Sequence, residues 1–480
     1  MEESLGHKAA KGAIWATIDR FGSMGIQFTV NLILARLLLP EDFGIIGMLA
    51  IFIAVSQTLI DGGFGSALIQ KKNPTQTDYS TIFFWNLIFS AFLYIALYLL
   101  SPLIAEFYSM PKLTAVLRVI SLSLIITGIF AIQRTRLQKI LAFRTIAFVN
   151  LLSYTLAAII AIVMAYRSFG VWSLVSMQLS YGIISVILVG IITHWTPNLC
   201  FSKSTIKELF GFGGYIMAAN ILQTICQNLQ GIIIGKRFSA TQMGYFSQAY
   251  KLDQITSYSI PQVIVQVMYP VYSSIQDDKE RLNNMVLMNM RVIAFLVYPI
   301  LATLILIAEP LIEFMYGQKW LSSAPYFKVL CVGGFFVCLQ NLNFYAVAAV
   351  GKSKSLFEWS FYKWGFLLAA LLIGMNFGMY GILWGMVASA FNIFITNAYL
   401  VSRHTSLSVV LQLRNIIPIF VLMSICLFVG ACVQYWLAIP FLSASVVLIN
   451  YLILALIFNM RALEETKKLI FKITSRSQFR

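Results

Sequence analysis

Charged residues are scarce in this chain of 480 residues, and their scarcity indicates the class of protein. Only 11% of the residues are Asp, Glu, Lys or Arg, whereas 59% are hydrophobic. A soluble domain carries roughly 25% charged residues. The composition therefore excludes an ordinary soluble protein and indicates an integral membrane protein.

Histidine and cysteine are also few, with three histidines, six cysteines and no CxxC pair. The histidines are too scattered for a metal site or a catalytic triad, and we interpret the cysteines as small apolar packing residues. The sequence has no glycine-rich phosphate loop, so ATP binding within this chain is not expected. We expect neither a cofactor nor a resident metal.

Long polar segments are missing as well. None of the stretches between hydrophobic segments, among them 193–210, 236–253, 276–284 and 309–324, is longer than 18 residues. Membrane enzymes that act on lipid-linked sugars generally present a large external domain with catalytic carboxylates or arginines. Since nothing of that size is present, the sequence favours transport over catalysis.

Hydrophobic segments, in contrast, fill the chain from end to end. Their lengths are near the 20 residues that cross about 30 Å of hydrocarbon. They predict an all-α integral membrane protein with about 14 transmembrane helices. The expected spans are 12–36, 43–60, 79–101, 113–133, 145–165, 171–192, 211–235, 254–275, 285–308, 325–349, 357–375, 379–400, 412–433 and 440–458.

The two halves of the chain carry the same turn and helix-end motifs in the same order. Phe169-Gly170-Val171-Trp172 recurs as Phe377-Gly378-Met379-Tyr380, and the Pro102–Tyr108 motif recurs as Pro310–Tyr316, both at a spacing of 208 residues. Ordered matches at one spacing indicate a duplicated bundle. Duplicated membrane bundles are typical of transporters that use alternating access.

The distribution of basic residues predicts the orientation in the membrane. With the N-terminus in the cytoplasm, 23 Lys and Arg residues fall on the cytoplasmic side and 9 on the other. The positive-inside rule therefore places both termini in the cytoplasm. It also explains most of the net charge of +16, so we expect membrane lipids and no nucleic acid as partners.

Polar residues form stripes on two repeat-related spans. On the first span they share one helical face, and the seventh span carries a matching set. The residues are Arg20, Ser23, Gln27 and Asn31 on the first span, and Asn220, Gln223 and Gln227 on the seventh. Amides of this kind either hold helices together or line a hydrated cavity. For the two stripes together we favour a cavity that accepts a hydroxyl-rich ligand such as a sugar.

Cationic residues are the second group of candidate substrate contacts. Arg20 lies roughly 12 Å into its span, at 1.5 Å per residue, so it requires either an anionic ligand or an internal carboxylate such as Asp61. Lys363 is a weaker candidate, because Glu358 precedes it by five residues and lysine side chains reach toward the interface. Arg36 and Arg237, at the outer ends of the repeated spans, serve either as interfacial anchors or as diphosphate contacts.

Two motifs carry a family resemblance. They are Ala35-Arg36-Leu37-Leu38-Leu39-Pro40-Glu41-Asp42-Phe43-Gly44 and Asp61-Gly62-Gly63-Phe64-Gly65-Ser66-Ala67-Leu68-Ile69-Gln70. Together they resemble the polysaccharide and O-antigen flippases of the multidrug/oligosaccharidyl-lipid/polysaccharide exporter superfamily, in particular its colanic-acid and teichuronic-acid exporter subgroup. Met243–Leu252 is similar to a later segment of the same subgroup.

The resemblance implies two six-helix lobes, residues 1–200 and 201–402, followed by two extra helices and a basic tail at 403–480. It implies that the protein moves an undecaprenyl-diphosphate-linked oligosaccharide from the cytoplasmic to the periplasmic leaflet of the bacterial cytoplasmic membrane. A polysaccharide polymerase or assembly machinery is then an expected partner.

A proton or sodium gradient is the expected driving force, with Asp19, Asp61 and Glu358 as candidate coupling residues. The sequence leaves a cation-coupled multidrug antiporter of the same fold as the main alternative. A lipid II flippase or a membrane glycosyl-transfer enzyme is the third, and the missing external domain disfavours the enzyme.

Overall fold

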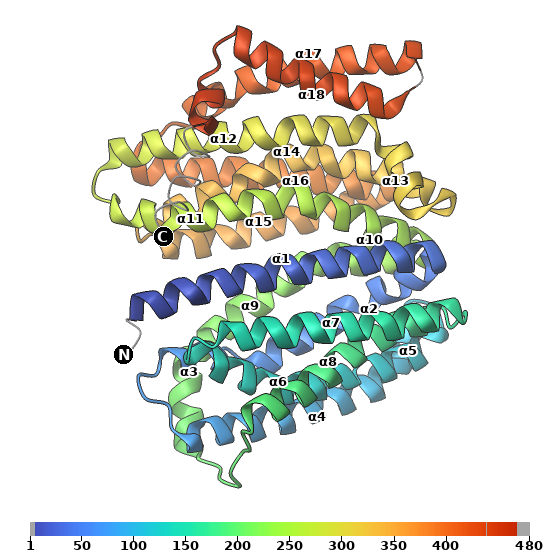
Figure 1. The fold of residues 1–480 in the computed structure, drawn as a ribbon, viewed down its shortest axis with the longest axis vertical. Coiled ribbons are helices and arrows are strands. Elements are labelled where there is room, and N and C mark those ends of the chain that lie inside the picture. The colour runs from blue at the N-terminus through green and yellow to red at the C-terminus, as the bar shows by residue number, and fades with distance from the viewer. Residues whose placement is uncertain (1–4, 438, 468–480) are drawn as a thin grey trace. The chain divides into compact units, whose positions relative to one another are not determined.

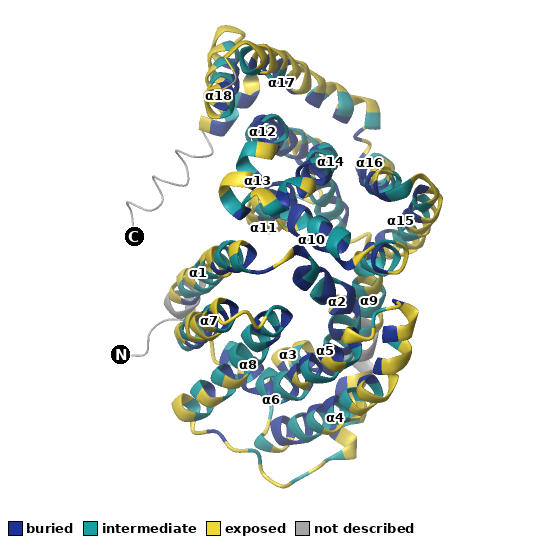
Figure 2. Ribbon diagram, turned by 90° about the vertical axis from the view of Figure 1, so that its right-hand side faces the viewer, coloured by how far each residue is buried: buried dark blue, intermediate teal, exposed yellow. Residues whose placement is uncertain are grey.

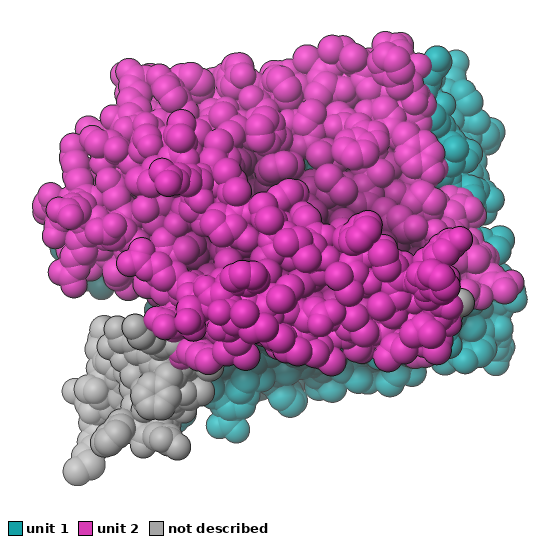
Figure 3. Space-filling model, turned by 90° about the horizontal axis from the view of Figure 1, so that it is seen from above, with its two compact units in different colours: residues 1–244 teal, residues 245–480 magenta. Residues whose placement is uncertain are grey.

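The structure is a computed structural model that describes residues 5–437 and 439–467. At residues 5–10, 13, 211–216 and 219 it describes the course of the backbone alone. Nearly all of the described chain is helical (Figure 1), which confirms the expected all-α class. The helices form two compact units, unit 1 (residues 1–244) and unit 2 (residues 245–480), coloured separately in Figure 3.

Unit 1 is a bundle in which α7 packs against α1 and α8, α4 packs against α5 and α6, and α2 packs against α9. Its helices are α1 (Leu5–Leu37), α2 (Pro40–Asp61), α3 (Phe64–Gln70), α4 (Gln76–Phe107), α5 (Lys112–Ile120), α6 (Leu122–Lys139), α7 (Phe143–Tyr166), α8 (Val171–Thr193), α9 (Lys203–Arg237) and the first residues of α10 (Ala240–Gln254).

Unit 2 is built around α14, which packs against α12 and α16, while α17 and α18 pack on each other and on α12. Its elements are the rest of α10, a π-helix (Ile255–Ser259), α11 (Ile260–Ser274), α12 (Lys279–Leu306), α13 (Ala308–Tyr316), a 3₁₀-helix (Gln318–Ser323), α14 (Ala324–Ala349), α15 (Ser353–Gly374), a 3₁₀-helix (Met375–Phe377), α16 (Gly378–Thr405), α17 (Val409–Leu437) and α18 (Pro440–Ile457). The two units are defined by packing, whereas the two expected lobes are defined by the sequence repeat. The lobe boundaries therefore stay a prediction.

Ten helical segments of the described chain are long and apolar enough to cross a membrane. Their outer faces are also apolar. On α4, Ile88, Phe92, Ile95 and Leu99 are all more than half exposed and recur at helical spacing. Figure 2 shows such exposed residues along α4 and α17. Exposed faces of this kind suit contact with lipid rather than water.

Local sequence signals explain several helix ends. Pro40 begins α2, where the first N–H groups have no acceptor within the helix, so the missing N–H of proline costs no hydrogen bond. The Asp42 carboxylate accepts a hydrogen bond from the Leu39 N–H at 3.1 Å. Gly170 and Gly378 are the glycines of the repeated motif. Gly170 immediately precedes α8 and Gly378 is the first residue of α16, with φ values of 56° and 75°. Because only glycine adopts such angles without strain, both repeats break their helices at the same place.

A reciprocal contact joins α2 to the beginning of α10. A Cβ atom added to Gly44 would lie 1.7 Å from the Ala240 carbonyl oxygen, and one added to Gly244 would lie 1.9 Å from the Pro40 carbonyl oxygen. Each glycine therefore permits the backbone of the other helix to approach closely, and neither position can accept a side chain without backbone movement.

Candidate functional site

Asp19 is the anionic centre of a polar network in unit 1. The Asn150 amide donates to both carboxylate oxygens of Asp19, at 3.0 and 3.1 Å, and the Ser23 hydroxyl donates to one of them at 3.3 Å. The Tyr181 hydroxyl donates to the Asn150 carbonyl oxygen at 3.2 Å. The network thus connects α1, α7 and α8, and hydrogen bonds to an ionised carboxylate are stronger than those between neutral groups.

The network leads to a cavity of about 380 Å³. Tyr181 and Tyr154 both line it, and their rings stack with centroids 3.9 Å apart. The lining residues on α6 and on α8 are spaced alternately three residues and one residue apart, so one face of each helix points into the cavity. Amides and hydroxyls supply its polar part, and none of the described lining residues is charged. The polar lining residues are Gln27, Gln57, Ser123, Thr127, Tyr154, Gln178 and Tyr181.

The polar stripe predicted on α1 contributes one residue to the Asp19 network and one to the cavity lining. Ser23 bonds to Asp19, and Gln27 lines the cavity. Arg20 lies on the exposed side of α1, and Asn31 is half-buried further along the helix. The structure therefore brings Ser23 and Gln27 to the network and its cavity.

The stripe predicted on α9 is placed differently. Asn220 is half-buried, Gln223 and Gln227 are exposed, and the described cavity lining includes no residue of α9. The Thr224 hydroxyl lies 3.1 Å from the Thr58 hydroxyl of α2, a hydrogen-bonding distance. At this position the polar residue joins two helices, as amides and hydroxyls commonly do in membranes.

Lys363 lies inside unit 2, where it is only 6% exposed. Its Nζ donates to the Asn397 side-chain oxygen at 3.1 Å and lies 5.8 Å from the centre of the Phe344 ring. The expectation that this lysine reaches toward the interface is therefore wrong, because an amide and an aromatic ring hold it between helices. A carboxylate oxygen of Glu358 lies instead 3.9 Å from the Lys354 Nζ, and the Glu358 side chain is 56% exposed.

The remaining predicted residues lie at helix ends. Arg36 and Arg237 are exposed in the last turns of α1 and α9, where the helix dipole favours a positive charge. Asp61 is the last residue of α2 and lies within electrostatic reach of Arg134. None of the three belongs to the cavity lining among the described residues.

Asp253 is a buried carboxylate that the sequence reasoning missed, because the stretch 236–253 was expected to be a connecting loop. Most of this stretch is instead helix α10. Polar residues around Asp253 lower the hydropathy of the stretch, so it resembled a loop. The Ser257 hydroxyl donates to Asp253, and the α14 backbone approaches this pair closely at Gly334. The π-helix that begins at Ile255 accommodates the arrangement, and such bulges are frequent at functional sites.

The described residues contain no cluster of three or more His, Cys, Asp or Glu side chains that could hold a metal ion. The polar groups of the described interior are mainly amides and hydroxyls around single charges. Amides and hydroxyls are able to exchange hydrogen bonds with a hydroxyl-rich ligand.

Comparison with known proteins identifies the family. A family model described as "Polysaccharide biosynthesis protein" matches residues 33–325, so the chain belongs to that family. The teichuronic acid biosynthesis protein TuaB of Bacillus subtilis (strain 168) is 26% identical over 360 residues, 74% of each chain. The lipopolysaccharide biosynthesis protein WzxC of Escherichia coli (strain K12) is 24% identical over 377 residues, 77% of this chain and 76% of WzxC. These matches confirm the resemblance that the motifs indicated.

Among solved structures, the lipid II flippase MurJ in an inward closed conformation has the same fold. The TM-score is 0.72 at 16% sequence identity, and the match covers 93% of this chain and 98% of MurJ. Together with the ten apolar helical segments, this shared fold indicates a multi-pass membrane protein.

Proposed function

We propose that the protein is a flippase that moves an undecaprenyl-diphosphate-linked oligosaccharide from the cytoplasmic to the periplasmic leaflet for surface polysaccharide synthesis. The observation that carries this proposal is the family match of a chain made of apolar membrane-crossing helices. Relatives named for teichuronic acid and lipopolysaccharide biosynthesis support it. In polysaccharide synthesis, the task suited to such a chain is transport of the lipid-linked intermediate.

The proposed topology has fourteen spans in the bacterial cytoplasmic membrane, with both termini in the cytoplasm. Ten apolar segments support it, and one of them contains both α15 and α16. Helices α1 and α9, and α10 continued by α11, are the other spans of this proposal. Two repeated six-helix lobes followed by α17 and α18 then account for the sequence repeat, and alternating access is the mechanism that such repeats use.

In this mechanism the uncharged cavity of unit 1 is a sugar contact. Gln27 and its neighbours present amide and hydroxyl groups, which exchange hydrogen bonds with sugar hydroxyls. The diphosphate requires cations, and we assign that part to Arg20, Arg36 and Arg237. For Lys363 the contacts with Asn397 and Phe344 support an internal role instead.

Asp19 is our proposed coupling residue, for a proton or a sodium ion. Its carboxylate is connected through Asn150 to Tyr181, which lines the cavity. A change of charge at Asp19 would therefore alter hydrogen bonds at the cavity wall. Within the described part of the chain, no hydrogen bond connects Asp61 or Glu358 to the cavity in this way, and the Glu358 side chain is more than half exposed.

A deletion strain with a blocked polymerase tests the function. Labelled undecaprenyl-diphosphate oligosaccharides should accumulate in the cytoplasmic leaflet, and the surface polymer should disappear. Expression of the intact protein should reverse both effects. Normal surface polymer without a trapped intermediate would reject the proposal.

The aromatic part of the cavity favours one second candidate, a multidrug antiporter. The stacked Tyr154–Tyr181 pair and Phe130 would suit a planar apolar compound. Under that function the deletion strain would become sensitive to several unrelated compounds while its surface polymer stayed normal. The same strain therefore distinguishes the two functions.

A further inference from the structure

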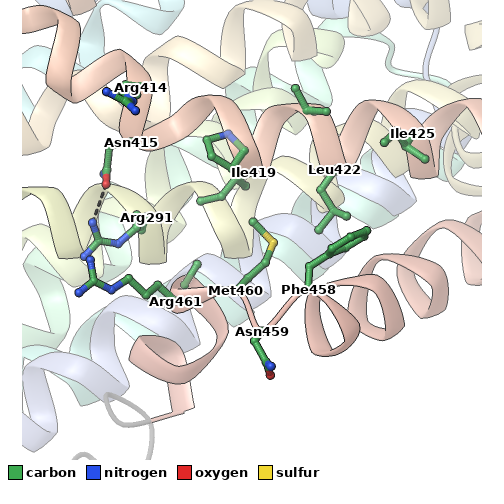
Figure 4. Close-up of a pocket in the computed structure, with 13 residues that line it drawn as sticks. Arg291, Arg414, Asn415, Ile419, Leu422, Ile425, Phe458, Asn459, Met460 and Arg461 are labelled. Atoms are coloured by element: carbon green, nitrogen blue, oxygen red, sulfur yellow. Dashed lines mark hydrogen bonds between the residues drawn. The ribbon is translucent and has the colours of Figure 1, made fainter.

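A pocket in unit 2, separate from the unit 1 cavity, combines arginines with an apolar slot. It lies between α12, α17 and the segment that follows α18, and its volume is about 680 Å³. Volumes of roughly 300–1,000 Å³ are typical of ligand sites. In Figure 4, Arg291, Arg414 and Arg461 lie at one end of the pocket, and Ile425 and Phe458 lie at the other.

Two of the three arginines bring positive charge that the described protein does not neutralise. Arg291 is fixed by the Glu465 carboxylate, with Nε to Oε2 at 2.8 Å, and by the Asn415 side-chain oxygen. Arg414 and Arg461 are exposed, and no described residue forms an ion pair or hydrogen bond with either side chain. The polar end of the pocket is thus complementary to an anion.

The other end of the pocket opens toward the apolar surface of the protein. Val421 and Ile425 are each 49% exposed, and Phe458 is 68% exposed. A soluble anion would meet the arginines but leave these walls uncovered, whereas a neutral lipid would gain nothing from the arginines. The ligand that matches both ends has an anionic head and a hydrocarbon chain.

We propose that this pocket binds an anionic glycerophospholipid of the surrounding membrane, with its phosphate between Arg414 and Arg461 and an acyl chain along α17.

A bulk lipid fits better than the lipid-linked sugar, because the pocket offers little to an oligosaccharide. Asn415 and Asn459 are its only uncharged polar side chains among the described residues. Asn415 is already bonded to Arg291 and to the Leu287 carbonyl oxygen. The bound lipid holds α17 and the segment after α18 against α12. Binding of this lipid is independent of which substrate the protein transports.

The test uses the full-length protein in nanodiscs of phosphatidylcholine, with or without phosphatidylglycerol. Phosphatidylglycerol should raise the Tm of the intact protein, and native mass spectrometry should show it bound. Removal of both charges in an Arg414→Gln/Arg461→Gln variant should weaken this binding about thirtyfold, at roughly one basic residue's contribution each. Arg281→Gln, which removes an exposed arginine outside the pocket, is the matched control and should bind as the intact protein does.

A second variant keeps the proposal testable if the double variant does not fold. Ile425→Trp fills the apolar end and leaves the arginines in place, and it should also abolish the rise in Tm. Equal binding by the double variant and the intact protein would overturn the proposal, as would an equal loss in Arg281→Gln. If undecaprenyl phosphate raises the Tm and phosphatidylglycerol does not, the pocket belongs to the transported lipid and the proposal is wrong.

Discussion

Each unit holds a charged side chain against an asparagine amide, and the two charges have opposite sign. In unit 1, Asn150 turns its NH₂ group toward the Asp19 carboxylate. In unit 2, Asn397 turns its oxygen toward the Lys363 ammonium group. One amide carries both a donor and an acceptor, so the same residue type can stabilise either charge.

The comparison separates what the repeat preserves from what it does not. Helices α7 and α8, and α15 and α16, are joined through the same Phe-Gly motif, at Gly170 and Gly378, with a positive φ at each glycine. The helical framework has therefore been preserved, whereas the two charge–amide pairs occupy different places in it, since Asp19 lies on α1 and Lys363 on α15. The surroundings differ too, since the Asp19 network reaches a cavity and Lys363 is enclosed beside Phe344.

The largest effect is expected at Arg20, the cation next to Asp19 in the chain. Arg20→Ala should abolish export of surface polymer while the protein remains at normal abundance in the membrane, because the diphosphate loses a cationic contact. Complementation of the deletion strain, with immunoblotting of membranes, measures both. Arg20→Lys should retain part of the activity. Normal export by Arg20→Ala, or failure of both variants to accumulate, would assign Arg20 a structural role.

A smaller loss is expected when the anion of unit 1 is removed. Asp19→Asn keeps the shape but loses a charge-assisted pair of hydrogen bonds, so export should fall roughly 10- to 100-fold. The rate of polymer appearance after induction measures it. Asp61→Asn is the matched control and should export normally. Loss of export in Asp61→Asn with normal export in Asp19→Asn would exchange their proposed roles.

The third prediction concerns the stability of unit 2. Asn397→Leu leaves the buried Lys363 ammonium group without its hydrogen-bond acceptor, which should cost about 2 kcal/mol. A fall in the Tm of the purified protein measures this cost. Lys363→Met removes the charge itself and should restore the Tm when combined with Asn397→Leu. If the double variant is no more stable than Asn397→Leu, the two side chains are not energetically coupled.

The smallest effect is expected at the cavity wall. Gln27→Leu removes one polar contact and should reduce export about fivefold, which corresponds to roughly 1 kcal/mol. Gln223→Leu, on the exposed side of α9, is its control. Equal effects of the two substitutions would show that the cavity of unit 1 is not a distinct contact for the sugar.

Much of the framework could be predicted from the sequence. Most of the expected spans fall within single helices, to within two residues at either end, because apolar segments of membrane length leave few other structures for the backbone. Gly62 and Gly170 mark real helix boundaries, since both adopt a positive φ. The span expected at 113–133 is broken at Ser121 between α5 and α6, which no change in hydropathy had indicated.

The candidate site could be predicted only in part. Gln27 was found because its neighbours on α1 form a polar stripe. Asn150 and Tyr181 were missed, since their importance comes from a contact between two helices. Asp253 was missed for a different reason, because a charged residue in a polar stretch resembles a loop. Tertiary contacts, rather than local sequence, identify such residues.

The contact between Gly44 and Gly244 has the form of an isologous interface. The carbonyl group of the first residue of each helix, Pro40 or Ala240, faces the glycine four positions into the other helix. Two copies of one polypeptide related by a two-fold axis would meet in this way, each presenting the same surface to the other. A single ancestral half, carrying this five-residue segment once, would already contain both sides of the contact that its fused descendants now share.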